Sequence, residues 1–258
     1  THGIITNIGK AHLEGFKNFE GVLKTKKELY DCVSKNKGVL FYNQDDEVLT
    51  SILPNIRIHS YGQNHAETIG QLIQLTPFVE FHYSIDQYTS PTLSTHIVGE
   101  YNFYNFLAAI SIGHYFKVSP DQMNDGITNY IPTNNRSQVE KTADNTLIID
   151  CYNANPTSMK AALESFHKIK NSNKTVILGD MRELGEDSIM EHQKIVDLLN
   201  TLEVDVILIG EEFAKTNHPF QHYTNTEKYS DNASTVKNQL ILLKGSRGIG
   251  LEKLIPLL

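Results

Sequence analysis

The chain has 258 residues, 40% of them hydrophobic and 21% charged, which is enough for one large folded domain or two of ordinary size. Its 23 basic and 30 acidic residues give a net charge of −7 without a dominant Lys/Arg block, so composition gives a nucleic-acid surface no support. Two cysteines, Cys32 and Cys151, exclude a disulfide framework. No apolar run could span a membrane and no secretory signal is recognisable, so we expect a cytoplasmic protein.

The first half of the chain alternates between strand-like and helix-like segments. Residues 3–8 form an apolar, strand-like run, and residues 19–33 carry apolar side chains at helical spacing. An apolar strand at 38–43, a short helix at 46–53 and a strand at 57–62 follow. This order predicts a β-α-β-α-β unit with parallel strands.

The pattern then changes before the chain reaches a boundary. Residues 70–98 hold β-rich runs broken by prolines and polar residues, which predicts antiparallel hairpins, and residues 101–116 form a helix that is apolar on nearly every face and therefore buried. Residues 131–138 are polar and contain a proline. We therefore predict two domains, 1–132 and 133–258.

Strands and helices alternate again in the second half. Strands are expected at 146–152, 175–180, 204–210, 221–224 and 240–245, and helices at 156–170, 187–202 and 226–238. The alternation predicts a doubly wound, Rossmann-like α/β domain.

Ligands of open parallel sheets collect at the carboxyl ends of strands, and polar side chains are frequent there in this chain. They include His12, Glu14, Asp45, Asp46, Asp150, Tyr152, Asn153, Asn155, Asp180, Glu183, Lys244, Ser246 and Arg247. Loops of α/β proteins are polar in any case, so position alone does not identify a site. The sequence has no G-x-x-x-x-G-K-[ST] phosphate loop, and residues 245–250 do not fit a dinucleotide fingerprint.

Several segments in a fixed order make a stronger signal. They are AHLEGF from residue 11, KKEL from 26, GEYNFYNFLAA from 99, NR from 135, DCYNANPTSM from 150, GDMRELG from 179 and KGSR from 244. In this order they resemble the Mur ligase family, and in particular its members that add D-alanyl-D-alanine. The resemblance implies the later part of a central ATPase domain, with a mostly parallel sheet plus antiparallel hairpins, followed by the Rossmann-like C-terminal domain. The family's N-terminal domain, ATP phosphate loop and adjacent acidic magnesium ligand have no counterpart here, so we expect this chain to be a piece of a longer protein.

The resemblance also implies a reaction. Members of this kind are expected to add D-alanyl-D-alanine to UDP-N-acetylmuramoyl-tripeptide through an acyl phosphate in peptidoglycan synthesis, using ATP and Mg²⁺. We expect this chain to be inactive by itself. The alternatives are a non-catalytic binding or regulatory module derived from a Mur ligase, and a nucleotide-dependent oxidoreductase, which the missing glycine fingerprint disfavours.

The implied catalytic residues are Lys26, His12 and Arg136. His12 resembles a magnesium ligand, and Lys26 resembles a lysine that the family carries as an N-carbamate, which can hold the same ion. The alternative for Lys26 is a solvated helix face. Arg136 matches an arginine expected on the phosphates of ATP, a task that suits a planar guanidinium.

Nucleotide contacts are implied for three further residues. Asn102 and Asn105 lie one helical turn apart, and their amides could meet the edge of adenine, with helix capping as the alternative. Asp150 matches the acid expected near the ribose hydroxyls. Because ATP contacts would then lie on both sides of residues 131–136, we predict a hinge near 133–135.

The amine substrate is expected near residues that follow two strands of the second half. Tyr152, Asn153, Asn155 and Ser158 would line its site, although a turn that caps the helix starting at Pro156 explains the same residues. Asp180 and Glu183 would orient the dipeptide, with a structural turn as the alternative.

Overall fold

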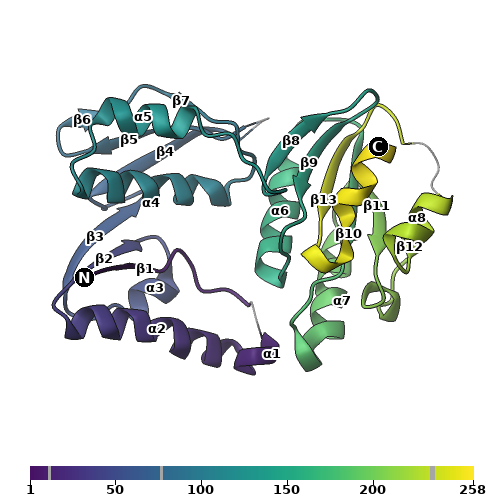
Figure 1. Ribbon diagram of the computed structural model, residues 1–258, viewed down its shortest axis with the longest axis horizontal. Helices are drawn as coiled ribbons and strands as arrows, with labels where there is room; N and C mark the ends of the chain where they lie inside the picture. Colours follow the sequence, from purple (N-terminus) through teal and green to yellow (C-terminus); the bar gives the residue numbers. More distant parts are fainter. Residues whose placement is uncertain (11–12, 76–77, 233–235) are drawn as a thin grey trace. The chain divides into compact units, whose positions relative to one another are not determined.

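The computed structural model describes residues 1–10, 13–75, 78–232 and 236–258, and its chain divides into two compact units (Figure 1). The N-terminal unit comprises residues 1–9 and 18–130, and the C-terminal unit comprises residues 10–17 and 131–258. The main division falls between Tyr130 and Ile131. The short segment 10–17, which follows the first strand in sequence, packs with the C-terminal unit.

The N-terminal unit is built on a mixed sheet in the order β1-β2-β3-β4-β5-β6, with β7 paired to β5. The strands are β1 (His2–Ile4), β2 (Val39–Asn43), β3 (Arg57–Gly62), β4 (Thr68–Gln74), β5 (Glu80–Ile85), β6 (Tyr88–Thr89) and β7 (Leu93–Ser94). Strands β1 to β4 pair in parallel, and β5 pairs antiparallel with β4, β6 and β7. The parallel unit and the hairpins are confirmed, but the first strand ends at Ile4 rather than at residue 8.

Most described helices of this unit begin at a side-chain cap that the sequence supplies. They are α2 (Phe19–Lys35), α3 (Glu47–Ser51), α4 (Tyr101–Tyr115) and α5 (Pro120–Thr128). Asn18 accepts the Gly21 N–H at the start of α2, and Asp46 accepts the Leu49 N–H at the start of α3. Helix α4 buries Phe103 and Leu107 in a core with residues of β5, as its apolar sequence predicts.

The C-terminal unit has a sheet in the order β12-β11-β10-β13-β9-β8. The strands are β8 (Gln138–Lys141), β9 (Thr146–Asp150), β10 (Lys174–Gly179), β11 (Asp205–Ile209), β12 (Gln221–Tyr223) and β13 (Leu240–Lys244). All pairs are parallel except β8 with β9. The five predicted strands are confirmed, whereas the edge strand β8 lies in a polar segment that carries no apolar alternation.

Helices cover both faces of this sheet (Figure 1). They are α6 (Pro156–Lys168), α7 (Ser188–Leu199) and α8 (Thr226–Asn232), with α1 (Leu13–Phe16) and the 3₁₀ turns η1 (Gly185–Asp187), η2 (Phe213–Lys215), η3 (Arg247–Ile249) and η4 (Leu251–Leu257). Helices α6 and α7 pack on each other, and α8 packs on η4. The predicted helix 226–238 is too long, because α8 ends at Asn232 and residues 236–238 are not helical.

Alternating side chains of the central strands face opposite helical layers. Ile149, Ile241 and Leu243 belong to one core with Tyr229 of α8 and Leu254 of η4. Because the central strands are parallel, their carboxyl ends lie at the same edge of the sheet, where each strand is followed by a loop. None of the helices in the described part of the chain is long and apolar enough to cross a membrane.

Candidate functional site

A buried ion pair joins the ends of β9 and β13. Lys244 and Asp150 are register partners in this parallel pair. The Nζ of Lys244 lies 2.5 Å from Oδ2 of Asp150 and 3.5 Å from the carbonyl oxygen of Asn153. Only 2% of the Lys244 side chain and 15% of the Asp150 side chain are exposed. One carboxylate oxygen of Asp150, the predicted ribose contact, is therefore bound to Lys244.

Two arginines lie over the ring of Tyr152, which follows Asp150 by two residues. The guanidinium carbon of Arg136 lies 3.8 Å from the ring centroid, and that of Arg247 lies 5.6 Å away. The loop that bears Arg136 is tied to the end of β9, because Cys151 donates its backbone N–H to the carbonyl of Asn135 at 2.9 Å. The structure thus brings together Arg136 and Tyr152, for which the sequence implied separate roles.

Asn155 and Ser158 form the cap of α6. Asn155 Oδ1 accepts the Ser158 N–H at 2.9 Å, and Ser158 Oγ accepts the Asn155 N–H at 3.2 Å. Pro156 occupies the first turn, where its missing N–H costs no hydrogen bond. The helix-capping alternative therefore describes the contacts of these two side chains, and a substrate role for them remains a prediction. Asn153 is exposed beside them.

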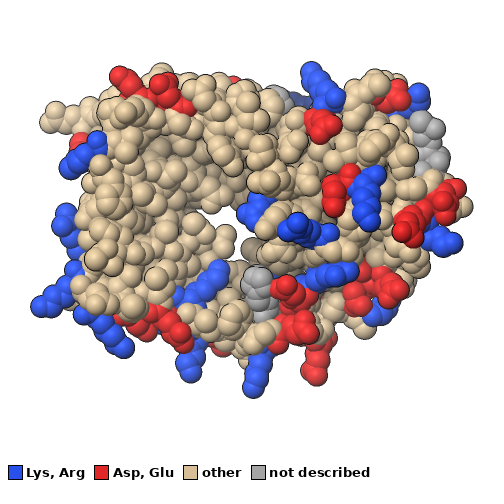
Figure 2. All heavy atoms as spheres, in the orientation of Figure 1, with Lys and Arg blue, Asp and Glu red and all other residues tan. Residues whose placement is uncertain are grey.

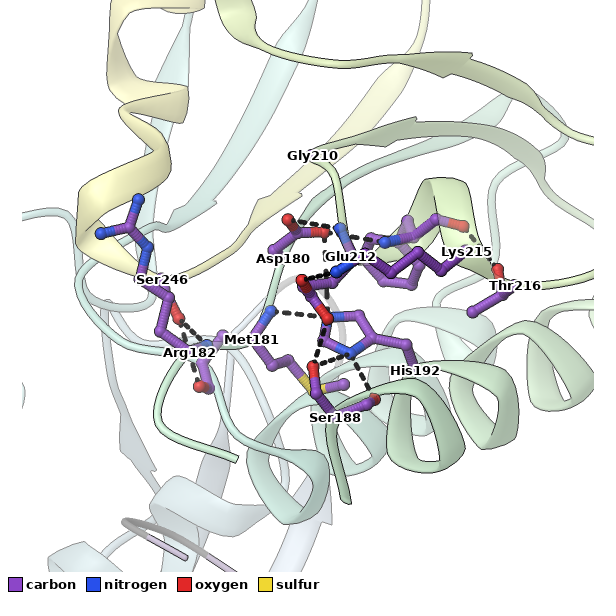
Figure 3. Close-up of polar contacts among 12 residues, drawn as sticks. Asp180, Met181, Arg182, Ser188, His192, Gly210, Glu212, Lys215, Thr216 and Ser246 are labelled. Atoms are coloured by element: carbon purple, nitrogen blue, oxygen red, sulfur yellow. Dashed lines mark hydrogen bonds and ion pairs between the residues drawn. The ribbon is translucent and has the colours of Figure 1, made fainter. Parts of the chain in front are cut away.

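Asp180 follows β10 and clamps the loop that follows β11 (Figure 3). The residue is 5% exposed, and its carboxylate accepts the backbone N–H groups of Glu212 and Phe213, each at 3.0 Å. These two groups lie at the start of η2, where unpaired N–H groups favour a carboxylate. Gly210 permits the approach, since a Cβ there would stand 2.1 Å from the Asp180 Cγ.

His192 of α7 fixes the next residue of the same loop (Figure 3). Its Nε2 accepts the Met181 N–H at 3.0 Å, and its Nδ1 lies 2.7 Å from the Ser188 carbonyl, to which it donates. This pair of bonds requires a neutral ring with its proton on Nδ1. Burial lowers the pKa of His192, which favours that neutral form.

A pocket of about 800 Å³ opens beside these loops within the C-terminal unit. Its charged lining residues are Glu14, Asp180, Arg182, Glu183, Glu211 and Glu212. Arg182 donates its backbone N–H to Ser246 Oγ at 2.9 Å, and its guanidinium donates to the Gly248 carbonyl at 3.2 Å. Asp180 and Glu183, both implied for the dipeptide, share this pocket, although the Asp180 carboxylate is already bound by backbone N–H groups.

The segment 10–17 is held to the C-terminal unit by side chains and backbone. Glu14 donates its N–H to the Glu183 carbonyl at 3.0 Å, and the Lys10 ammonium lies 2.8 Å from Oε1 of Glu191. Glu191 is 3% exposed and also pairs with Lys194 at 2.9 Å. Burial opposes its ionisation, but the two lysines hold its pKa below the usual value. His12, the predicted magnesium ligand of this segment, lies outside the described residues.

Lys26 lies on α2 in the N-terminal unit. Its Nζ donates to the carbonyl of Asn7 at 2.9 Å, and burial lowers its pKa below that of a solvated lysine. The side chain is therefore not simply part of a solvated helix face. No cluster of three or more His, Cys, Asp or Glu side chains suited to a metal ion occurs among the described residues.

Asn102 and Asn105 are neighbours on α4, as their spacing predicts. Asn105 donates its amide N–H to Oδ1 of Asn102 at 3.0 Å, and Asn102 donates to the Val98 carbonyl at 2.8 Å. The second bond ties Asn102 to the turn that precedes the helix. Asn105 is exposed.

Sequence reasoning missed His192 and Glu191, two buried polar residues that shape the loops around the pocket. Both lie on α7 among residues that read as an ordinary amphipathic helix, so no local signal distinguishes them. Arg182 lies inside the GDMRELG segment, but the sequence predicts no role for it. On the face drawn in Figure 2, basic and acidic side chains are interspersed without a broad patch of one sign, in line with the composition.

A mostly parallel sheet and a doubly wound domain, with charged residues gathered where strands end, define a two-domain protein of the α/β class, in which ligands commonly bind at the carboxyl ends of strands. The chain belongs to the Mur ligase family: residues 1–113 match the Mur ligase middle domain, and residues 135–247 match the Mur ligase, glutamate ligase domain.

Relatives agree with this membership, and solved structures share the fold. The chain is 31% identical to the UDP-N-acetylmuramoyl-tripeptide–D-alanyl-D-alanine ligase of Bacillus subtilis (strain 168), over 98% of this chain and 58% of the relative. The ligase of the same name from Rickettsia prowazekii (strain Madrid E) is 30% identical, over 98% and 60%. The fold of this chain is similar to that of MurF from Acinetobacter baumannii (TM-score 0.82, 24% identity, 99% of this chain and 58% of that one). MurF ligase from Thermotoga maritima, solved in complex with ADP, has a TM-score of 0.85 at 20% identity, over 99% and 61%. The chain thus spans about three fifths of the length of these proteins.

Proposed function

We propose that this chain is the ATP-binding and amine-binding part of a ligase that adds D-alanyl-D-alanine to UDP-N-acetylmuramoyl-tripeptide. The observation that carries the proposal is the 31% identity, over 98% of this chain, to a ligase with that name. Exposed charged side chains near the strand ends, those of Arg136 and Glu183, support a catalytic rather than a purely structural role. A non-catalytic module would keep the fold without needing them.

The proposed reaction has two steps. An oxygen of the tripeptide carboxylate attacks the γ-phosphorus of ATP, and ADP leaves. The amine of D-alanyl-D-alanine then attacks the acyl carbon, loses a proton and expels phosphate, which keeps that carboxylate oxygen. Both steps gather negative charge, so fixed cations and donors must face the reacting groups.

Arg136 is the residue proposed for the ATP phosphates. It is exposed, and its guanidinium is stacked on Tyr152 rather than buried in an ion pair. Asn102 and Asn105 are proposed for the adenine edge. Asp150 is proposed for the ribose, and its bond to Lys244 would fix the direction of the carboxylate toward the sugar.

Lys26 and His12 are proposed as the magnesium ligands of this chain. Mg²⁺, when bound, would spread the charge on the transferring phosphoryl group. The chemistry of Lys26 fits a carbamate, because its lowered pKa increases the fraction of neutral amine that can form an N–C bond with carbon dioxide and release a proton. The product is an oxygen anion, the ligand type that magnesium prefers.

The amine substrate is assigned to the C-terminal unit. Glu183 lines the pocket with an exposed side chain and could meet the ammonium of the dipeptide. Asp180 would act by holding the loops in place, since its carboxylate already accepts two N–H groups. Asn153, Asn155 and Ser158 complete the proposed site of the amine substrate.

The test is a reconstituted reaction with the full-length natural protein that contains this chain. Phosphate should be released from ATP when the UDP-muramoyl tripeptide and D-alanyl-D-alanine are both present, and omission of either should reduce release to background. Release with a single amino acid in place of the dipeptide would reassign the substrate. No release under any combination would favour the non-catalytic module.

A further inference from the structure

We propose that Tyr152 is a positioning residue that holds Arg136, and with it Arg247, for an anionic group, rather than a contact for the amine substrate. The proposal rests on the assignment of Arg136 to the phosphates of ATP. It starts from the two guanidinium groups that lie over the Tyr152 ring, at 3.8 Å for Arg136 and 5.6 Å for Arg247.

The backbone explains why the three residues meet. Tyr152 follows β9, Arg247 begins η3 after β13, and these two strands are paired in parallel so that they end at the same edge. The Arg136 loop joins them through the bond from the Cys151 N–H to the Asn135 carbonyl. In that loop Asn134, Asn135 and Ser137 all have φ values in the left-handed region, at 65°, 55° and 48°. Asparagine tolerates this conformation better than most residues, whereas serine adopts it rarely, so at Ser137 it persists where surrounding contacts hold it.

The ring has a specific effect on two like charges. Both guanidinium carbons lie over one ring, so their separation is at most the sum of the two distances, and they repel each other. The negative face of an aromatic ring offsets part of that repulsion through cation–π attraction. A ring at this position therefore lowers the cost of bringing two arginines to one anion.

Stacking also leaves the chemistry of the guanidinium intact. A guanidinium that lies over a ring uses its flat face, whereas its N–H donors point outward in its plane. Tyr152 can thus fix the orientation of Arg136 without consuming the donors that a phosphate would need. Tyr152 as a residue is 37% exposed, so this contact is open to solvent and to a ligand.

Two substitutions separate this role from the others. Tyr152→Phe keeps the ring and removes the hydroxyl, whereas Tyr152→Leu keeps apolar bulk and removes the ring. In steady-state kinetics of the full-length protein, we expect Tyr152→Phe to keep the KM for ATP within about twofold, and Tyr152→Leu to raise it about fivefold, the range of a partly exposed cation–π contact. The KM for D-alanyl-D-alanine should not change in either variant. Tyr130→Leu, which removes another exposed tyrosine ring, is the matched control and should match the wild type.

Three results would overturn the proposal. They are an unchanged KM for ATP in Tyr152→Leu, an equal rise of that KM in Tyr152→Phe, and an effect confined to the KM for the dipeptide, which would return Tyr152 to the amine site.

A second measurement does not depend on ligase activity. The NMR signals of the Arg136 side chain should show a ring-current shift that survives Tyr152→Phe and disappears in Tyr152→Leu. If the wild type failed to ligate, the proposed function would fall, while these shifts would still show whether Tyr152 holds Arg136; equal shifts in all three proteins would refute the positioning role.

Discussion

Lys244 carries its ammonium into the interior of the C-terminal unit, where a lone charge would be costly. Asp150 makes the position tolerable by supplying a carboxylate at 2.5 Å, and the carbonyl of Asn153 takes a further N–H. Breaking such a pair leaves one charge buried without its partner, which costs more than the pair itself contributes. The two residues therefore depend on each other.

Lys244→Met should lower the free energy of unfolding of the C-terminal unit by about 3 kcal/mol, because methionine fills the space of the lysine stem but leaves Asp150 uncompensated. The matched control is Lys237→Met, which removes an exposed pair with Asp144 and should cost less than about 1 kcal/mol. Hydrogen exchange of the buried strand amides in β9 and β13 measures both. Equal effects of the two substitutions would contradict this account.

His192 makes the stability of the C-terminal unit depend on pH. Its pKa is lowered in the folded state, so between that value and the ordinary value of 6.5 the unfolded chain binds more protons, and stability rises with pH. The contribution is fully present above pH 6.5 and is lost as pH falls through the folded pKa. Protonation of Nε2 would also break the bond from the Met181 N–H.

We therefore expect the melting temperature to rise between about pH 5 and pH 7, the range in which histidine ordinarily titrates. His192→Gln should flatten that rise. His167→Gln, at an exposed histidine on α6, should leave the slope as in the wild type. Differential scanning calorimetry at a series of pH values is the measurement. A slope that His192→Gln leaves unchanged would remove His192 as its source.

At the scale of elements, the loops after β10 and β11 are locked together by one carboxylate. Asp180 holds the start of η2, and Gly210 has a φ of 137° that favours glycine and leaves room for the Asp180 side chain. The sequence gives no sign of this clamp, because the groups that bind Asp180 are backbone N–H groups 32 and 33 residues away.

Gly210→Ala should therefore be among the most damaging small substitutions, since the new Cβ would stand 2.1 Å from the Asp180 Cγ on a strained backbone. We expect a loss of about 3 kcal/mol in the free energy of unfolding. Gly126→Ala on α5 is the control, because a Cβ there meets nothing within 4 Å and the helix should gain up to about 1 kcal/mol. Urea denaturation distinguishes the two, and a neutral Gly210→Ala would show that the loops adjust freely.

Elements with strong apolar patterns could be predicted from the sequence, and those defined by partners could not. The parallel strands and α4 follow from runs such as LILLK and FLAAI, whereas β8 is polar and exists because β9 offers its open edge. For the candidate site, strand-end position brought Asp150 and Tyr152 into view. Strand-end position did not reveal that Lys244 binds Asp150 or that Arg136 lies over the Tyr152 ring, because both contacts depend on strand register and loop path.

At the scale of the whole molecule, the chain joins two α/β units that match the middle and C-terminal domains of the Mur ligases. Each unit contributes its own chemistry to the proposed reaction. The N-terminal unit carries Lys26 and the Asn102–Asn105 pair, and the C-terminal unit carries Arg136 and the acidic pocket. The proposed reaction therefore consumes ATP, a carboxylate and an amine together.

The most direct test follows one oxygen atom. The terminal carboxylate of the UDP-muramoyl tripeptide is labelled with oxygen-18 and incubated with ATP, D-alanyl-D-alanine and the full-length protein, and product and phosphate are analysed by mass spectrometry. The account predicts a product extended by one dipeptide and one labelled oxygen in each phosphate released. Unlabelled phosphate, or phosphate release without the extended product, would contradict it.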